Sequence, residues 1–275
     1  MTLALVLGGG GVAGIAWHTG VLLGRARAGV DVSTADLLVG TSAGATVGAQ
    51  LGAGHALDLL FDRQVDPATL ATERTPPVAM ADLLERLTPI YTAGLEPAER
   101  RRMLGSMALA TDTVSEDERR AIVEGRLVGH DWPARPLLVP VVDAVTGERR
   151  VLDAGSGTDL VDAVAASSAV PGVWPPVTLD GTRYIDGGVW SLTNADLAAG
   201  HDRVVVLAPV VDPGVARQIE ALGPDVRVEL VSPDAASLEA FGADVLDPAN
   251  RAPAARAGLE QGRAEAGRVR ALLAG

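Results

Sequence analysis

Residues 3–17 of the chain read LALVLGGGGVAGIAW, and this stretch decides the fold. Five consecutive apolar residues, 3–7, are typical of a parallel strand that is buried on both faces. The glycines that follow allow a tight turn, and residues 12–28 continue with the spacing of a helix. The stretch therefore predicts a buried strand, a turn and a helix in direct succession.

The same succession recurs further along the chain. A second short apolar run, residues 36–39, meets GTSAG at 40–44, and small residues continue with helical spacing to about residue 54. Further strand and helix signals lie at residues 136–142, 149–152, 158–168 (helix), 183–185, 203–207, 225–231 and 252–273 (helix). Alternating strands and helices predict an α/β fold, a three-layer sandwich with a largely parallel central sheet and helices on both faces.

Residues 55–135 interrupt this alternation with a polar, helical pattern. Amphipathic stretches are expected at 96–107 and 116–124, and TERTPP at 72–77 is a break. We expect this segment to cover the sheet as a helical cap. Because the chain has no internal repeat and no low-complexity linker, we predict a single domain over residues 1–275.

Composition excludes several classes of protein. A formal net charge of −12 and an aromatic content of 3% argue against nucleic-acid binding, which needs clustered positive charge and stacking platforms. The chain has no Cys, and all 23 basic residues are Arg. Thiol catalysis, a Ser/Lys dyad, a phosphate-loop lysine and a Schiff-base lysine are therefore excluded.

The apolar N-terminal stretch does not have the pattern of a signal peptide. It has no basic residue before the apolar run and is broken by four glycines. Elsewhere the chain has no uninterrupted apolar run of about 18 residues, the length that a membrane span requires. We expect a cytoplasmic protein, for which any membrane contact would be peripheral, transient and apolar.

Gly40-Thr41-Ser42-Ala43-Gly44 fits the nucleophile-elbow pattern. Small residues on both sides allow a serine to occupy a sharp turn between strand and helix, with its hydroxyl group exposed above the sheet. The backbone N–H of Ala43 would then lie at a helix N-terminus, where it can donate to an oxyanion. The alternative interpretation is a close-packed turn whose serine only caps the helix.

The glycine run at residues 8–11 has two functional interpretations. Its backbone N–H groups can converge on an anion, such as the oxyanion of a tetrahedral intermediate. Alternatively, Gly9, Gly11 and Gly14 match a dinucleotide-binding fingerprint, with Asp31 near the position of a ribose-binding acid. A plain strand-to-helix turn also fits. The neighbouring serine elbow favours acyl transfer, because a dinucleotide site has no use for an exposed serine.

A serine nucleophile needs a base, and the sequence offers two candidates. Asp186 ends a predicted strand and is followed by Gly187 and Gly188, which leave space for another chain segment to approach. His201 could instead complete a Ser, Asp, His order. The other histidines, for which structural or solvent-facing positions are expected, are His18, His55 and His130.

Taken together, these segments resemble the patatin-like phospholipase family. The glycine loop, the GTSAG elbow and the Asp-Gly-Gly motif occur in the family's order, and residues 166–177, ASSAVPGVWPPV, resemble the block that precedes its aspartate. The resemblance extends over residues 3–54 and 160–196. It implies a Ser/Asp dyad without histidine, in which Asp186 takes the proton of Ser42 and an acyl-enzyme forms and is hydrolysed.

The resemblance also assigns roles to the residues around this dyad. It implies that the oxyanion hole is formed by Gly9, Gly10, Gly11 and Ala43. It implies supporting positions in the motifs for Gly14, Gly40, Gly44, Gly187 and Gly188. We expect neither a cofactor nor a metal ion.

One departure from the family pattern bears on the substrate. Many relatives place Arg or Lys where this chain has Ala13. Because such a cation could pair with a phospholipid phosphate, a neutral lipid or a simple acyl ester is as good a candidate substrate as a phospholipid. Two other hypotheses stay open: a dinucleotide-binding Rossmann-type protein that uses Gly9, Gly11 and Gly14, and a catalytically silent module of the same fold.

Overall fold

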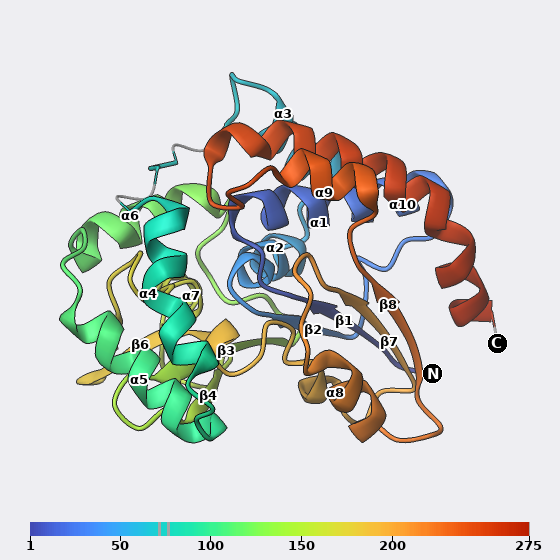
Figure 1. Cartoon of the computed structure of the whole chain (residues 1–275). Helices are drawn as coiled ribbons and strands as arrows, with labels where there is room; N and C mark the ends of the chain where they lie inside the picture. The colour runs from blue at the N-terminus through green and yellow to red at the C-terminus, as the bar shows by residue number, and fades with distance from the viewer. Residues whose placement is uncertain (71–72, 76–77, 275) are drawn as a thin grey trace.

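The computed structural model describes residues 1–70, 73–75 and 78–274, and a central β-sheet runs through the molecule (Figure 1). The sheet has the strand order β5-β6-β3-β2-β1-β7-β8, with β4 paired to β3. The strands are β1 Leu3–Leu7, β2 Leu37–Gly40, β3 Leu137–Asp143, β4 Arg149–Leu152, β5 Val177–Leu179, β6 Thr182–Asp186, β7 Arg203–Leu207 and β8 Arg227–Val231.

The sheet is mostly parallel, as predicted. The parallel pairs are β3–β2, β2–β1, β1–β7 and β7–β8. The antiparallel pairs are β3–β4, β3–β6 and β5–β6. The strands expected from the apolar runs are all present within a few residues of their predicted ends. Strand β5 was not predicted, because three residues are too few to form a recognisable pattern.

Helices cover both faces of the sheet (Figure 1). The α-helices are α1 Gly11–Arg27, α2 Ala43–Gly52, α3 Leu57–Val65, α4 Met80–Thr92, α5 Pro97–Ala110, α6 Glu116–Arg126, α7 Leu160–Ser167, α8 Val215–Ala221, α9 Ala235–Phe241 and α10 Arg251–Ala274. Short 3₁₀ segments are η1 Gly187–Val189, η2 Ala195–Ala198 and η3 Pro248–Asn250. Within the described residues, none of the helices combines the length and the apolar character that a membrane crossing requires.

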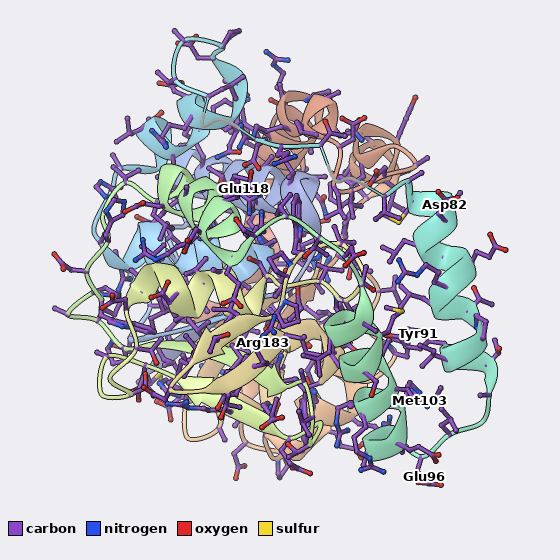
Figure 2. All side chains as sticks on the ribbon, turned by 90° about the vertical axis from the view of Figure 1, so that its left-hand side faces the viewer. Asp82, Tyr91, Glu96, Met103, Glu118 and Arg183 are labelled. Carbon is purple, nitrogen blue, oxygen red and sulfur yellow. The ribbon has the colours of Figure 1, made fainter. Side chains whose placement is uncertain are left out.

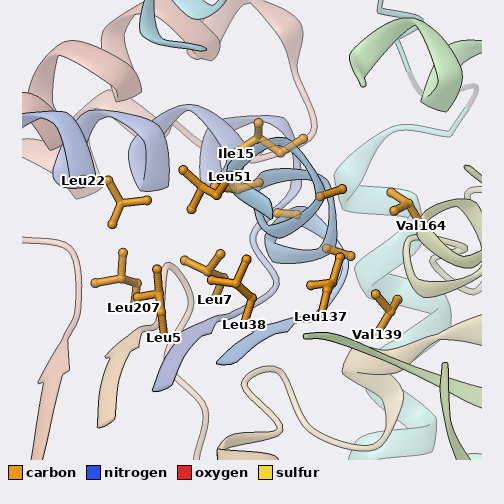
Figure 3. Packing of buried hydrophobic residues seen from close by; sticks show 14 of the residues in the cluster. Leu5, Leu7, Ile15, Leu22, Leu38, Leu51, Leu137, Val139, Val164 and Leu207 are labelled. Carbon is orange, nitrogen blue, oxygen red and sulfur yellow. The ribbon is translucent and has the colours of Figure 1, made fainter. Parts of the chain in front are cut away.

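The alternation of side chains along the buried strands builds two cores. In β1, Leu5 and Leu7 face the larger core under α1, α2, α7 and α10, whereas Ala4 and Val6 face a smaller core next to η2 and α8. Figure 3 shows the larger core, in which the leucines of neighbouring strands meet the helix side chains Ile15 and Leu51. Continuous apolar runs are needed because both faces of each central strand are covered.

The helical segment expected over residues 55–135 is present, and its helices pack against different parts of the molecule. Helix α3 packs against α1 and α10. Helices α4 and α5 lie together beside the antiparallel end of the sheet, and α6 packs against α7 (Figure 1). Of the expected break at 72–77, residues 73–75 are described and form neither helix nor strand, whereas residues 72, 76 and 77 lie outside the described residues.

Helices α1 and α10 approach each other closely along a seam of glycines. A Cβ atom on Gly24 would lie 2.1 Å from the carbonyl oxygen of Leu259, and one on Gly262 would lie 2.2 Å from that of Val21. Beside this seam, the indole N–H of Trp17 donates to Oε1 of Gln261 at 3.0 Å. The two backbones can therefore touch only because these positions carry no side chain.

We expect Gly262→Ala to destabilise the fold and Gly267→Ala to stabilise it. Both glycines lie in α10, but a Cβ atom on Gly267 would meet nothing within 4 Å. Overpacking at position 262 should lower the free energy of unfolding by about 1–3 kcal/mol. Alanine at the exposed position 267 should raise it by about 0.5–1 kcal/mol through helix propensity. Urea unfolding measures both, and equal effects of the two substitutions would contradict the close seam.

Candidate active site

The candidate site lies where the chain order across the sheet reverses. Strand β1 is flanked by β2 on one side and by β7 on the other. In open α/β sheets, ligands bind beyond the carboxyl ends of the strands at such a switch point. The turns after β1 and β2 both open into this region, and they carry the glycine run and Ser42.

Ser42 occupies a sharp turn between β2 and α2. Its backbone has φ 54° and ψ −112°, a conformation that residues other than glycine rarely adopt and that costs about 1–3 kcal/mol. The flanking glycines make the turn sterically feasible, since a Cβ atom on Gly44 would lie 1.9 Å from the carbonyl oxygen of Leu7 and one on Gly40 would lie 2.5 Å from that of Gly44. Such local strain is characteristic of functional positions.

Two polar side chains from elsewhere in the chain brace this turn. The backbone N–H of Ser42 donates to Oγ of Ser167 at 3.1 Å, and that hydroxyl group donates to the carbonyl oxygen of Pro140 at 2.8 Å. The buried amide of Asn194 donates to Oγ1 of Thr41 at 3.0 Å and to the carbonyl oxygen of Gly187 at 3.3 Å. Asn194 thus links the serine turn to the turn after β6.

Asp186 is the last residue of β6, and its carboxyl group is buried. Its Oδ1 accepts the backbone N–H of Gly188 at 2.7 Å, and the side chain of Ser42 lies close enough to lower the pKa of this carboxyl group. Gly187 lies on the backbone of β3, where a Cβ atom would meet the carbonyl oxygen of Pro140 at 2.2 Å. The close approach of another chain segment therefore occurs at Gly187, whereas Gly188 neighbours the side chains of Asp186 and Leu192.

Burial raises the pKa of Asp186 to about 6. The N–H of Gly188, the hydroxyl group of Ser42 and the positive charge of Arg119 act in the opposite direction. A carboxyl group with such a pKa is a stronger proton acceptor than an exposed aspartate, and it is still mostly ionised at neutral pH.

The glycine turn supplies backbone donors beside Ser42. Gly10 precedes α1 and Gly11 begins it, while Ala43 begins α2, so their N–H groups have no intrahelical acceptor. Gly9 differs, because its N–H already donates to the carbonyl oxygen of Leu192 at 2.7 Å. The sequence-based assignment of Gly9 to the oxyanion hole does not fit this bond. Gly14 lies one turn into α1, close to the side chains of Ala43 and Pro209.

An apolar pocket of about 210 Å³ opens onto these groups. Ser42, Asp186 and Gly9–Gly11 line its floor, so the structure brings both turns and the aspartate to one cavity. Its walls are mainly apolar side chains from α4, α5 and the turn after β6, namely Met80, Leu83, Leu87, Leu104, Val189 and Leu192. The pocket has the shape and chemistry to hold a hydrocarbon chain with one end at Ser42.

The family model described as "Patatin-like phospholipase" matches residues 5–199. The chain belongs to the patatin-like phospholipase family. Among solved structures, the chain is similar to VipD from Legionella pneumophila, with 13% identity and a TM-score of 0.49, over 97% of this chain and 66% of that one. It is also similar to the type III effector protein ExoU, with 15% identity and a TM-score of 0.45, over 97% of this chain and 53% of that one.

The histidines of this patatin-like chain lie away from Ser42. All four are among the described residues, and none lines the pocket. His201 lies two residues before β7, at the sheet edge opposite to the one where β2 leads into Ser42, and its Nδ1 lies 3.2 Å from the carbonyl oxygen of Ala198. His18 is fully buried in α1, and burial lowers its pKa to about 3. The arrangement gives no support to His201 as the base.

The dinucleotide hypothesis fails on the position of Asp31. A ribose-binding acid lies at the carboxyl end of the second strand. In the patatin-like chain, Asp31 precedes β2, is exposed, and accepts the backbone N–H of Ser33 at 2.8 Å in a local turn. It therefore lies at the opposite edge of the sheet from Gly9, Gly11 and Gly14.

Three residues of the site could not be singled out from the sequence. Ser167 lies in the motif block before the aspartate, but only the fold places its hydroxyl group under Ser42. Asn194 follows the Asp-Gly-Gly motif and carried no signal of its own. Arg119, which acts on Asp186 electrostatically, comes from the helical segment in which no motif was recognised.

Asp186→Asn should stabilise the fold at pH 8. Because the folded state raises the pKa of Asp186 from 3.8 to about 6, the stability associated with this group is fully present below the lower value and falls as pH rises through the higher one. A shift of this size corresponds to about 2–3 kcal/mol. We expect the variant to exceed the wild type in free energy of unfolding by that order at pH 8, and by far less near pH 4.

Urea titrations at several pH values measure this difference. Asp131→Asn is the matched control, since that aspartate is exposed in a loop and its replacement should produce no pH-dependent gain. An Asp186→Asn effect that is the same at both ends of the pH range would contradict the raised pKa.

Proposed function

We propose that this protein is a cytoplasmic serine acyl-ester hydrolase that acts on lipids through a Ser42/Asp186 dyad. The observation that carries the proposal is the strained Ser42, which shares an apolar pocket with the buried carboxyl group of Asp186 and with two helix N-termini. A catalytically silent module would have no need for these three features together. Family membership supports the same class of reaction.

The reaction would proceed by acyl transfer in two steps. Oγ of Ser42 attacks the ester carbonyl carbon while Asp186 accepts the hydroxyl proton. The tetrahedral intermediate collapses, the C–O bond to the alcohol breaks, and Asp186 returns the proton to the leaving alkoxide. Water then attacks the carbonyl carbon of the acyl-enzyme while Asp186 accepts a proton from it. The bond from this carbon to Oγ of Ser42 breaks, Asp186 returns the proton to Oγ, and the fatty acid leaves.

Backbone donors would stabilise the negative charge that develops on the carbonyl oxygen. The N–H groups of Gly10, Gly11 and Ala43 are the proposed oxyanion hole, and the dipoles of α1 and α2 add to their effect. In comparable sites, each such donor contributes about 2.7–4 kcal/mol to the transition state. The turns are held in place before substrate binds, so little reorganisation is needed.

The acyl chain would lie between α4 and α5. Figure 2 shows α4, which carries Asp82 and Tyr91, standing at the margin of the molecule beside α5 with Met103. Several large apolar side chains of these two helices are exposed, namely Leu84, Tyr91, Met103 and Leu109. We propose that this rim makes transient, apolar contact with a lipid surface while the pocket takes up one chain.

Loss of either dyad member should abolish turnover. We expect Ser42→Ala to lower kcat/KM for p-nitrophenyl butyrate by about a thousandfold or more, and Asp186→Asn to lower it by about 10²–10⁴-fold. His201→Ala should leave it within about twofold. In the wild type, kcat/KM should rise with pH through an apparent pKa near that of Asp186, about 6, because the base must be ionised.

Matched thermal melts and circular dichroism of the variants provide the folding control. Activity that survives Ser42→Ala would overturn the proposed function. Activity that is lost on His201→Ala but kept on Asp186→Asn would replace the dyad by a histidine mechanism.

Filling the pocket should alter chain-length selectivity. Leu87→Trp places a larger side chain in the pocket wall, so kcat/KM for p-nitrophenyl palmitate should fall by about 10- to 100-fold while that for the butyrate changes little. Leu84→Trp is the control, because Leu84 lies on the same helix with 54% of its surface exposed. Equal losses on both esters, or the same loss in the control, would place the acyl chain elsewhere.

A further inference from the structure

A second, smaller chamber meets the acyl pocket at Ser42. Its volume is about 20 Å³, against 210 Å³ for the acyl pocket, and Ser42 and Gly11 line both. A space of that size holds one compact group and is too small for a hydrocarbon chain. Its charged lining residues are three arginines, Arg74, Arg119 and Arg126, and Ser168 adds a hydroxyl group.

Arg119 is the residue that makes this chamber unusual. Its side chain comes from α6, and only 1% of the residue is exposed. Nη2 donates to Oγ of Ser168 at 3.2 Å, and the guanidinium group lies 4.2 Å from the centre of the Trp174 ring. Nε and Nη1 have no hydrogen-bond acceptor among the described residues. A buried cation with two unused donors is costly unless a ligand satisfies it.

Two nearby carboxylates, those of Glu73 and Glu118, are engaged by other arginines. Glu73 accepts two hydrogen bonds from Arg126, at 2.8 and 2.6 Å, and one from Arg251 at 2.7 Å. Glu118 pairs with Arg74 at 3.4 Å. The lining of the chamber therefore has a net positive charge, in a chain whose formal net charge is −12.

Two helix N-termini add to the positive potential. Gly11 and Val12 at the start of α1 and Ala43 at the start of α2 line the chamber. Helices of 17 and 10 residues direct the positive ends of their dipoles there, while the N–H groups of Gly11 and Ala43 remain assigned to the ester carbonyl oxygen. The helix dipoles and the guanidinium group of Arg119 act on the same small volume. Such an arrangement is typical of a site that binds a phosphate or carboxylate group.

We propose that this chamber binds a compact oxyanion on the alcohol part of the substrate, with Arg119 as its anchor. The proposal rests on the proposed function, because it places the acyl chain in the apolar pocket and the alcohol across Ser42 in the chamber. The favoured substrates are acyl esters whose alcohol ends in a phosphate monoester or a carboxylate. Arg119 thereby supplies, from α6, the cation that is missing at Ala13.

The decisive experiment compares two esters of one acyl chain, a monoacylglycerol 3-phosphate and the uncharged monoacylglycerol. At pH 8, where Asp186 is ionised, the wild type should prefer the phosphate ester. Arg119→Met should lower the preference for the phosphate ester, measured as the ratio of the two kcat/KM values, by about tenfold or more, because any effect that the lost charge has on Asp186 acts on both esters alike. Arg119→Lys should restore part of the preference, and Arg120→Met, which removes a half-exposed charge from the same helix, should leave it unchanged.

Inorganic phosphate tests the chamber separately from the substrate. It should inhibit hydrolysis of the neutral ester competitively in the wild type, and at least tenfold more weakly in Arg119→Met. Acetate in a parallel titration distinguishes a carboxylate preference from a phosphate preference, and a monoacyl glycerophosphocholine should be a poor substrate because its phosphodiester head group exceeds the chamber.

Three outcomes would overturn the proposal. Equal losses on charged and neutral esters in Arg119→Met would make Arg119 a structural residue that only stacks on Trp174. Phosphate that binds without competing would indicate a free-anion site rather than a substrate subsite. If the wild type hydrolyses no ester, calorimetry still shows whether phosphate binds to the wild type and whether Arg119→Met weakens that binding. The proposed function and the anion site can therefore fail independently.

Discussion

The arrangement of the site depends on one backbone contact, the approach of α2 to the end of β1 at Gly44. A Cβ atom there would lie 1.9 Å from the carbonyl oxygen of Leu7, so no other residue fits without a shift of helix or strand. This contact places the turn that carries Ser42 against the turn that carries Gly10 and Gly11. The strained serine, its backbone donors and the mouth of the pocket all follow from that spacing.

The local architecture could be predicted from the sequence because it is encoded locally. The apolar runs of the buried strands, the glycine turn and the elbow each fit within about fifteen residues, and the order of the motifs indicated the family. The occupied N–H of Gly9, the support from Ser167 and Asn194, and the position of Arg119 depend on segments that meet only in the folded chain. The periodicity of apolar residues does not predict contacts between distant segments. Strand β5 and helices α8 and α9 are too short to be recognised from it.

The site balances burial against a few directed charges. Apolar surroundings raise the pKa of Asp186, while the N–H of Gly188, the hydroxyl group of Ser42 and Arg119 lower it. The same burial leaves Arg119 with donors that no described residue satisfies. In an acidic chain with few aromatic residues, the proposed site therefore depends on a handful of enclosed polar atoms.

The glycine seam between α1 and α10 has a consequence for the order in which the molecule assembles. Trp17 and Gln261, which bond beside the seam, are 244 positions apart. Closing so long a loop is entropically demanding, and contacts of this separation form late and slowly. During synthesis, the glycine face of α1 therefore stays exposed until residues 251–274, which form α10, have been made. A chaperone, or a neighbouring chain in a concentrated solution, would meet this exposed face first.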